Sequence, residues 1–283
     1  MTFPGGSGWQ RGEARASSGV LAYRRGGGGT PLLYLHDAGA DTVGSPAFDD
    51  LARDHDVVVL DLPGYGGSTP PGPMSSPARM ADLLAELLDA LGWTAAVVAG
   101  SSLGGWFGME LAIRHPSRVR ALVLADPAGL HCPEDYLFAL FCQGRAAASA
   151  QRLIAEAIWE RLPADEGLAE GGDVGAAVWG PWVQELAAAA WCSWHPYTQN
   201  PRLLALAGRI RCPVHILWGA RDALIPLRHG RVLAAVVPGA RLEILAGAGH
   251  LPVLDAPERF AAAVRGVSSG PTDPDPPERL AVG

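Results

Sequence analysis

Short apolar runs recur along the chain, and most of them contain no alternating polar positions. Uninterrupted runs of valine, leucine and isoleucine are typical of strands that are covered on both faces of a sheet. Six runs of this kind predict six strands, at residues 31–35, 57–61, 95–99, 121–125, 214–218 and 241–245.

Segments with helical periodicity lie between these runs. The clearest of them, residues 76–92, begins with Ser76 as a candidate N-cap and Pro77 in the first turn, and Gly92 ends it. Its apolar residues share one helical face: Met80, Leu83, Leu84, Leu87, Leu88 and Leu91. The alternation of strands and helices predicts an α/β fold, with a mostly parallel sheet flanked by helices.

The alternation stops between residues 131 and 200. This stretch is rich in alanine, has no strand pattern and contains five of the nine tryptophans, so it predicts a helical insertion between two strands. Glycine, serine and proline dominate both ends of the chain, a composition typical of disorder. We therefore expect a core of residues 19–130 and 201–266, an insertion of 131–200, a flexible segment 1–18 and a disordered tail 267–283.

Composition and charge narrow the class of protein. The 283 residues are 48% hydrophobic and 18% charged, which is ordinary for a globular enzyme and too apolar for a disordered protein. The net charge is -7 and the arginines form no basic run, so we expect no nucleic-acid-binding surface.

Targeting and metal-binding patterns are also missing from the sequence. No segment approaches the ~18 consecutive apolar residues of a membrane helix, and the first residues contain no apolar signal stretch. We therefore expect a cytoplasmic protein without membrane contact. The four cysteines form no C-x-x-C pair and have no histidine at metal spacing, so we expect free thiols and no metal ion.

Residues 97–108, VVAGSSLGGWFG, place two serines between glycines at the end of a predicted strand. Ligands bind beyond such strand ends in an open parallel sheet. The pattern G-x-S-x-G fits when Ser102 is central, whereas centring it on Ser101 fails. Glycines two residues before and after a serine leave room for a sharp, strained turn from strand to helix. Ser102 is therefore a candidate nucleophile and the Leu103 N–H a candidate oxyanion donor; the alternative is a tight turn in which Ser102 only caps a helix.

A serine hydroxyl is a weak nucleophile without a base, so the chain must supply one. Of the eight histidines, His250 follows the last predicted strand in a loop of small residues, at the sheet edge where Ser102 is expected. Asp222 follows the strand 214–218 and is the favoured acid to orient the imidazole, with Asp126 as the competitor after the strand 121–125. The non-catalytic interpretation of Asp222 is a surface ion pair.

From about Gly19 to Gly266, the sequence resembles the α/β-hydrolase family. The resemblance rests on the motifs GSSLG, DLPGYGGS, ILWGARDALIP and AGAGHLPVLDAPERF. It implies an eight-stranded sheet with a helical cap inserted after the sixth strand, which corresponds to the insertion. It also implies a second oxyanion donor in the loop after YLH, which we assign to Ala38 with Gly39 as the alternative.

Two positions depart from the family pattern. The oxyanion loop usually reads His-Gly, and here it reads His36-Asp37. A carboxylate beside a developing oxyanion would oppose catalysis, so Asp37 is expected to turn away or to contact substrate. Family members that cleave carbon–carbon bonds usually carry tryptophan after the catalytic histidine, where this chain has Leu251, and this difference favours esters or thioesters.

The resemblance and the candidate residues together predict a serine hydrolase. It would cleave an ester or thioester of a largely apolar small molecule through an acyl-enzyme, without a cofactor. Asp37, Ser101, Trp191 and Trp194 are the expected substrate contacts, although tryptophans in the insertion equally suit packing against the core. The alternatives are a biosynthetic acyltransferase or cyclising thioesterase, a carbon–carbon bond hydrolase and a non-enzymatic ligand receptor. The sequence does not predict an oligomeric state.

Overall fold

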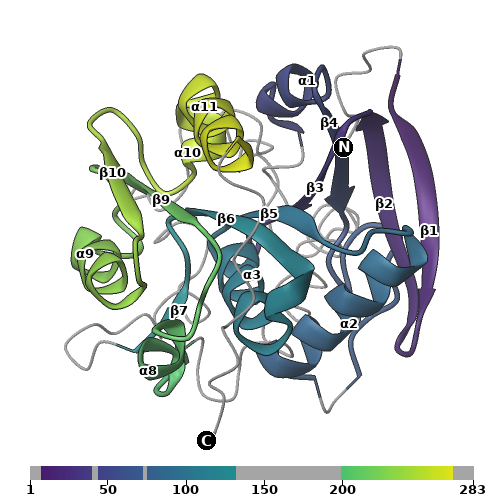
Figure 1. Ribbon diagram of the computed structural model, residues 1–283, viewed down its shortest axis with the longest axis horizontal. Helices are drawn as coiled ribbons and strands as arrows, with labels where there is room; N and C mark the ends of the chain where they lie inside the picture. The colour runs from purple at the N-terminus through teal and green to yellow at the C-terminus, as the bar shows by residue number, and fades with distance from the viewer. Residues whose placement is uncertain (1–7, 40–43, 73–74, 132–198, 270–283) are drawn as a thin grey trace, which may run out of the picture.

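The computed structural model describes residues 8–39, 44–72, 75–131 and 199–269, which form a sheet with helices on both faces (Figure 1). The sheet has eight strands: β1 (Gln10–Ala16), β2 (Gly19–Gly27), β3 (Thr30–Leu35), β4 (His55–Leu60), β5 (Ala96–Ser101), β6 (Val119–Ala125), β9 (Val214–Gly219) and β10 (Arg241–Leu245). Their spatial order is β1-β2-β4-β3-β5-β6-β9-β10. The strands from β4 to β10 in that order pair in parallel, whereas β2 pairs antiparallel with both β1 and β4. The predicted α/β fold is therefore confirmed.

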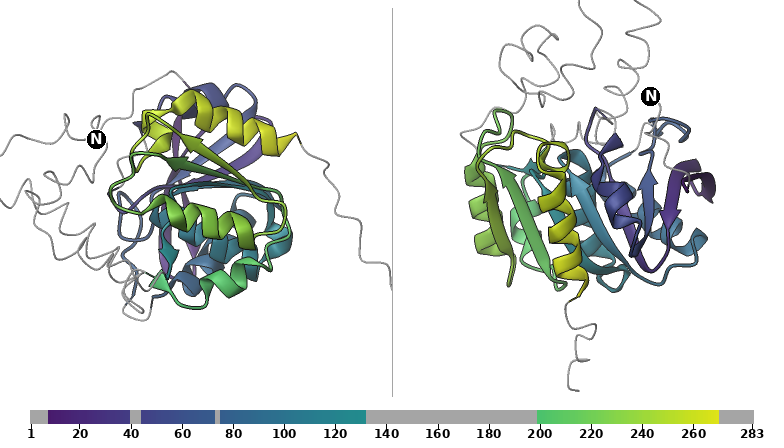
Figure 2. Two further views of the ribbon diagram at one scale, coloured as in Figure 1. Left: turned by 90° about the vertical axis from the view of Figure 1, so that its left-hand side faces the viewer. Right: turned by 90° about the horizontal axis from the view of Figure 1, so that it is seen from above.

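Helices cover the sheet in two layers, as the views in Figure 2 show. One layer contains α2 (Pro77–Ala90), α3 (Leu103–Arg114), α8 (Leu203–Ala207) and α9 (Leu227–Val236), and the short 3-10 helix η2 (Pro116–Arg118) follows α3. The other layer contains α1 (Ala47–Leu51), α10 (Pro252–Asp255) and α11 (Pro257–Ser268). Each layer packs its apolar face on the sheet, so the strands are covered on both sides.

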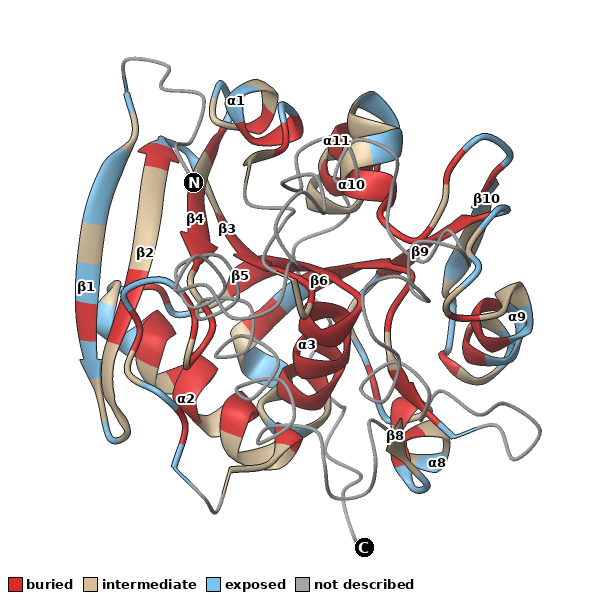
Figure 3. Ribbon diagram, turned by 180° about the vertical axis from the view of Figure 1, so that it is seen from behind, coloured by how far each residue is buried: buried red, intermediate tan, exposed pale blue. Residues whose placement is uncertain are grey.

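Two apolar clusters lie on the two faces of the sheet. Successive side chains along β3 alternate between them, with Leu33 and Leu35 in one cluster and Leu32 and Tyr34 in the other. β5 and β9 are buried along their whole length, and β3, β4 and β6 along most of theirs (Figure 3). This double burial is the physical reason for the uninterrupted apolar runs that predict β3, β4, β5, β6 and β9.

The expectation of a flexible segment over residues 1–18 is wrong for residues 10–16, which form β1. This strand pairs with β2 over seven residues through backbone hydrogen bonds, which do not depend on side-chain polarity. It lies at the sheet edge with Ala14 as its only buried residue, so it carries almost no apolar pattern. At the other end, α11 continues to Ser268, two residues beyond the expected core boundary, and residues 270–283 lie outside the described residues.

The predicted insertion falls almost entirely outside the described residues. The residues at its borders are described: β7 (Gly129–Leu130), just before it, pairs in parallel with β8 (Gln199–Asn200) at its end. The Asn200 amide donates a hydrogen bond of 3.0 Å to the buried Glu110 carboxylate of α3. Both ends of the insertion are thus joined to each other and to the core. In the described part of the chain, no helix has both the length and the apolar character needed to cross a membrane.

Candidate active site

Ser102 occupies a sharp turn between β5 and α3. Its backbone angles are φ 48° and ψ -113°, and only Asp126 shares a positive φ among the non-glycine residues that the structure describes. Such backbone strain concentrates at functional sites. The turn lies at the carboxyl end of a central parallel strand, where this class of sheet binds ligands.

The flanking glycines are required by close backbone packing. A Cβ atom on Gly100 would lie 2.5 Å from the carbonyl carbon of Gly104. A Cβ atom on Gly104 would lie 2.1 Å from the carbonyl oxygen of Leu35 and 2.5 Å from that of His36. The glycine spacing that the sequence shows therefore allows the turn to close, and it brings the loop after β3 against the start of α3.

Ser101 does not belong to the site, so the expectation that it contacts substrate is wrong. Its side chain is fully buried, and its hydroxyl accepts a hydrogen bond of 2.9 Å from the Tyr34 hydroxyl. Tyr34 belongs to the apolar cluster with Phe48 and Phe260 on the side of α1 and α11. Ser101 is thus a structural residue of the core beneath the turn.

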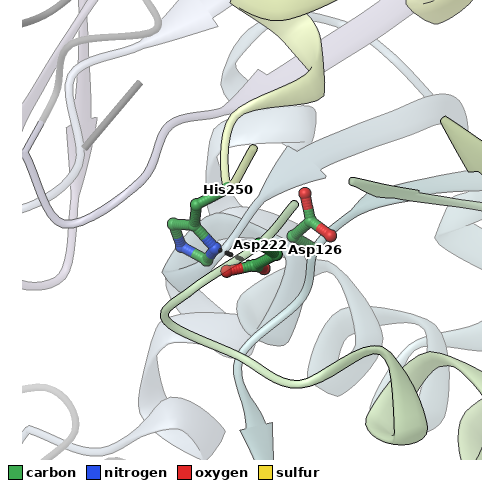
Figure 4. Close-up of side chains that lie close together, drawn as sticks. All are labelled: Asp126, Asp222 and His250. Atoms are coloured by element: carbon green, nitrogen blue, oxygen red, sulfur yellow. Dashed lines mark hydrogen bonds and ion pairs between the residues drawn. The ribbon is translucent and has the colours of Figure 1, made fainter. Parts of the chain in front are cut away.

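His250 and Asp222 meet beside the carboxyl ends of the strands (Figure 4). His250 Nδ1 lies 2.8 Å from Asp222 Oδ2, and the two side chains are 6% and 1% exposed. Asp222 Oδ1 accepts backbone hydrogen bonds from Leu224 and Ile225 at 2.8 and 2.9 Å. A carboxylate held in this way keeps the proton on Nδ1 and leaves Nε2 as the basic nitrogen. Nε2 is buried and makes no hydrogen bond to a described residue, so Ser102 and His250 are not joined directly.

Charges around His250 determine its pKa. Burial alone would lower the pKa, but the negative charge and hydrogen bond of Asp222 outweigh burial, and the charges of Asp37 and Asp255 add to them. The pKa of His250 is therefore raised above its ordinary value. The arrangement stabilises an imidazolium, the form that a histidine base takes after it accepts a proton.

The loop after β3 is fixed by its own histidine. The Leu62 N–H donates to His36 Nε2 at 3.0 Å, so Nδ1 carries the proton and donates to the Asp37 carbonyl at 2.6 Å. Burial lowers the pKa of His36 by more than the nearby Asp37 raises it, which keeps this ring neutral. The Tyr65 hydroxyl donates to the Ala38 carbonyl at 2.9 Å. These bonds fix the loop whose Leu35 and His36 carbonyls pack against Gly104 in the first turn of α3. The leading N–H groups of this helix, including that of Leu103, have no acceptor within the helix.

Asp37 lies in the same loop and is 6% exposed. Its Oδ1 accepts a hydrogen bond of 2.6 Å from the Gly39 N–H. Its Oδ2 is buried without a hydrogen-bond partner among the described residues. Because its charge acts on His250, Asp37 borders the site. One of its oxygens is bonded within the loop, and the other has no partner among the described residues.

Asp126 also joins this cluster. One carboxyl oxygen of Asp126, one of Asp222 and one ring nitrogen of His250 all lie within 4.8 Å of one another. Three such donors could hold a metal ion, but hydrogen bonds already occupy most of them. Both oxygens of Asp222 and Oδ1 of Asp126 accept N–H donors, and Asp222 holds Nδ1 of His250. The set therefore fits a hydrogen-bonded network better than a metal site.

Sequence reasoning did not find the residues that support the site. Tyr34 beneath Ser101, Tyr65 against Ala38 and the ring of His36 act through tertiary hydrogen bonds. Tyr65 lies in the motif DLPGYGGS, which in the sequence supports only the resemblance to the family. Trp191 and Trp194 lie outside the described residues, so their role as substrate contacts stays a prediction.

Comparison with known proteins identifies the family. Residues 31–257 match the sequence profile of the alpha/beta hydrolase fold. The chain belongs to the α/β-hydrolase family. This membership agrees with the strand order and with the strained serine turn, and it supports hydrolase activity.

Relatives of this α/β hydrolase have different activities. The pimeloyl-[acyl-carrier protein] methyl ester esterase of Chromobacterium violaceum is 31% identical, over 84% of this chain and 94% of that protein. The 2-hydroxymuconate semialdehyde hydrolase of Pseudomonas putida is 31% identical, over 84% of this chain and 86% of that protein. The dihydrolipoyllysine-residue acetyltransferase component of the acetoin cleaving system of Cupriavidus necator is 31% identical over 86% of this chain, but the match spans only 64% of that longer protein. The family is thus established, whereas the relatives do not agree on one reaction.

Proposed function

We propose that this α/β hydrolase is a serine hydrolase that cleaves an ester or thioester of a largely apolar small molecule through an acyl-enzyme. The observation that carries this proposal is the strained conformation of Ser102, at φ 48°, at the same edge of the parallel sheet as a buried His250–Asp222 pair. Strain of this kind is kept where it serves a function, and a buried imidazole–carboxylate pair is the base that a serine nucleophile needs.

In the proposed mechanism, Ser102 Oγ attacks the carbonyl carbon of the substrate and His250 Nε2 accepts the hydroxyl proton. Asp222 holds the imidazole in the required tautomer and stabilises the imidazolium. The proton then passes to the leaving alcohol or thiol, and the acyl group stays on Ser102. Water attacks the acyl-enzyme with His250 again as base, and the acid product leaves.

The oxyanion of each tetrahedral intermediate would be held by two backbone N–H groups, those of Leu103 and Ala38. Support for this pair comes from Gly104, where close packing brings the loop after β3 to the start of α3. Preorganised N–H donors at such a position are worth roughly 10²- to 10³-fold in turnover each. Tyr65 and His36 contribute by fixing the loop rather than by touching substrate.

Two rival reactions use the same groups. Acyl transfer, favoured by the similarity to the acetyltransferase component, would replace water with an alcohol, thiol or amine acceptor. Carbon–carbon bond cleavage is favoured by the similarity to the 2-hydroxymuconate semialdehyde hydrolase, and it is disfavoured by Leu251 after the histidine. We place ester or thioester hydrolysis first for two reasons. Leu251 departs from the carbon–carbon hydrolases, and the match covers 94% of the esterase relative, against 86% of the semialdehyde hydrolase and 64% of the acetyltransferase component.

A panel of acyl esters and thioesters of graded chain length tests the proposal, with and without added alcohol or amine acceptors. We expect hydrolysis, a preference for apolar acyl groups, and little transfer product.

Trp191→Ala and Trp194→Ala should change the chain-length preference, because aromatic side chains supply large apolar area to a pocket. Melting temperatures that fall with an unchanged preference would assign these tryptophans to packing alone. Product dominated by acceptor adducts would favour the transferase.

The charge of Asp37 gives a prediction for the pH dependence of kcat/KM. The base works only when it is neutral, so kcat/KM falls at low pH as His250 becomes protonated. Because the pKa of His250 is raised, the midpoint of this fall, the acid limb of the profile, lies above the ordinary histidine pKa of about 6.5. Asp37→Asn removes a negative charge that stabilises the imidazolium, so the His250 pKa falls and the acid limb moves to lower pH. Asp82→Asn, at a half-exposed position on α2, is the matched control and should leave the limb in place. A limb that does not move, or that moves to higher pH, would contradict the placement of Asp37 beside the reacting groups.

A further inference from the structure

Asp126 occupies a strained and buried position that the proposed reaction does not explain. It follows β6 directly, is 0% exposed and has a φ of 43°. Its N–H donates to the Leu217 carbonyl at 3.1 Å, and its Oδ1 accepts the Gly219 N–H at 3.0 Å. Asp126 thus links the end of β6 to the end of β9 at Gly219. Asp222 follows Gly219 three residues later.

The Asp126 carboxyl group has a second carboxyl group as its neighbour. An oxygen of Asp126 and an oxygen of Asp222 lie within 4.8 Å of each other (Figure 4). No described arginine or histidine forms an ion pair with Asp126, and its Oδ2 is buried without a hydrogen-bond partner among the described residues. Two carboxylates this close in a buried site oppose each other's ionised form, which favours a proton on one of them.

Hydrogen bonds decide which carboxyl group keeps the proton. Asp222 accepts three N–H donors, from Leu224, Ile225 and His250, and these stabilise its ionised form. Asp126 accepts one, from Gly219. A carboxylate has about four lone pairs, so Asp222 retains one position for a further donor.

We propose that Asp126 is a positioning residue. Its carboxyl group stays protonated at neutral pH and donates a hydrogen bond to the Asp222 carboxylate. The inference rests on the proposed function, because it assigns Asp126 a role in supporting the acid of that triad. The proton gives the otherwise unpartnered Asp126 oxygen an acceptor and fixes Asp222 against His250. A neutral Asp126 also spares His250 a second adjacent negative charge, which would raise its pKa further and keep the base protonated.

Electrostatics agree with this arrangement. Burial raises the pKa of Asp126 well above its ordinary value, and the charges of Asp222 and Asp255 add to this, whereas the Gly219 N–H opposes it. The charged and titratable groups around Asp126 are therefore Asp222 after β9, His250 after β10 and Asp255 in α10.

A pair of substitutions separates the donated proton from the backbone conformation. Asp126→Asn keeps an acceptor for Gly219 and offers an N–H to Asp222, and asparagine tolerates a positive φ. Asp126→Gly also tolerates this φ but removes both the donor to Asp222 and the acceptor of the Gly219 N–H. We expect kcat of Asp126→Asn to stay within about threefold of the wild type, and kcat of Asp126→Gly to fall on the order of 10- to 100-fold with KM little changed, the loss expected from a misplaced catalytic group.

Infrared difference spectra show the proton directly and do not depend on turnover. In wild type minus Asp126→Asn at neutral pH, we expect the carbonyl band of a protonated, isotope-labelled aspartate. An acid with a raised folded-state pKa also makes stability fall as pH rises above about 4, toward that pKa. Asp126→Asn lacks this titration. The free energy of unfolding of the variant minus that of the wild type should therefore increase between about pH 5 and about pH 8.

The outcomes are distinguishable from failure of the proposed function. A carboxylate band in place of the carbonyl band would overturn the protonated state, even in an inactive protein. An Asp126→Asn variant as impaired as Asp126→Gly, or an Asp126→Gly variant as active as the wild type, would overturn the positioning role. A wild type that loses activity in a chelator and regains it with zinc would overturn it in favour of a metal site.

Discussion

Ser102→Ala lowers kcat on ester substrates by roughly 10⁴- to 10⁶-fold, if Ser102 is the nucleophile, because no other group in the turn replaces its hydroxyl. The fold stays intact, since only one oxygen is removed, and the melting temperature changes by less than about 4 °C. Steady-state kinetics and thermal melts of the purified variant check both numbers.

Ser101→Ala is the matched control for this substitution. It removes the hydrogen bond from Tyr34 within the core, so it costs about 1 kcal/mol of stability while activity stays within about tenfold. The two neighbouring serines should therefore show opposite effects, one on turnover and one on stability. An inactive Ser101→Ala beside an active Ser102→Ala would mean that the turn presents the other serine.

Asp222→Asn should lower kcat on the order of 10⁴-fold through the imidazole tautomer. The N–H groups of Leu224 and Ile225 hold the amide oxygen in the place of Oδ1, so the amide NH₂ faces His250. Nδ1 must then accept a hydrogen bond, the proton moves to Nε2, and the nitrogen that should take the Ser102 proton is no longer free. Measurement of kcat with a good ester checks this loss.

Asp82→Asn, at a half-exposed position, controls for the general effect of removing a carboxylate and should leave kcat unchanged. The comparison with Asp126→Asn then assigns the acid, since Asp126 is the alternative at the end of the neighbouring strand. Equal losses at Asp222 and Asp126, or a larger loss at Asp126, would transfer the role of triad acid to Asp126.

Local patterns predicted the central sheet and the turn at Ser102. The parallel strands are buried on both faces, so they carry an uninterrupted apolar run, and the turn needs glycine at Gly100 and Gly104 for steric reasons that leave a mark in the sequence. The apolar pattern does not predict β1 and β2. They pair through backbone hydrogen bonds, and few of their side chains are buried, so neither strand carries an apolar run.

Side-chain direction and distance between strands were harder to predict. Adjacent residues in an extended strand point to opposite faces, a signal that could have placed Ser101 in the core away from Ser102. The approach of Asp126 to Asp222 has no such signal, because it depends on the pairing of β6 with β9, which residues 126–213 separate in the sequence. For the same reason, the sequence presented the two acids as competitors, and the structure brings both to His250.

Labelling with a fluorophosphonate probe tests the central claim, that Ser102 is a nucleophile activated by His250. The probe forms a covalent adduct only with an activated serine, and digestion followed by mass spectrometry locates it. We predict one adduct per chain, on Ser102, absent from Ser102→Ala and formed far more slowly in His250→Gln. An unlabelled protein, or an adduct on a residue other than Ser102, would contradict the account.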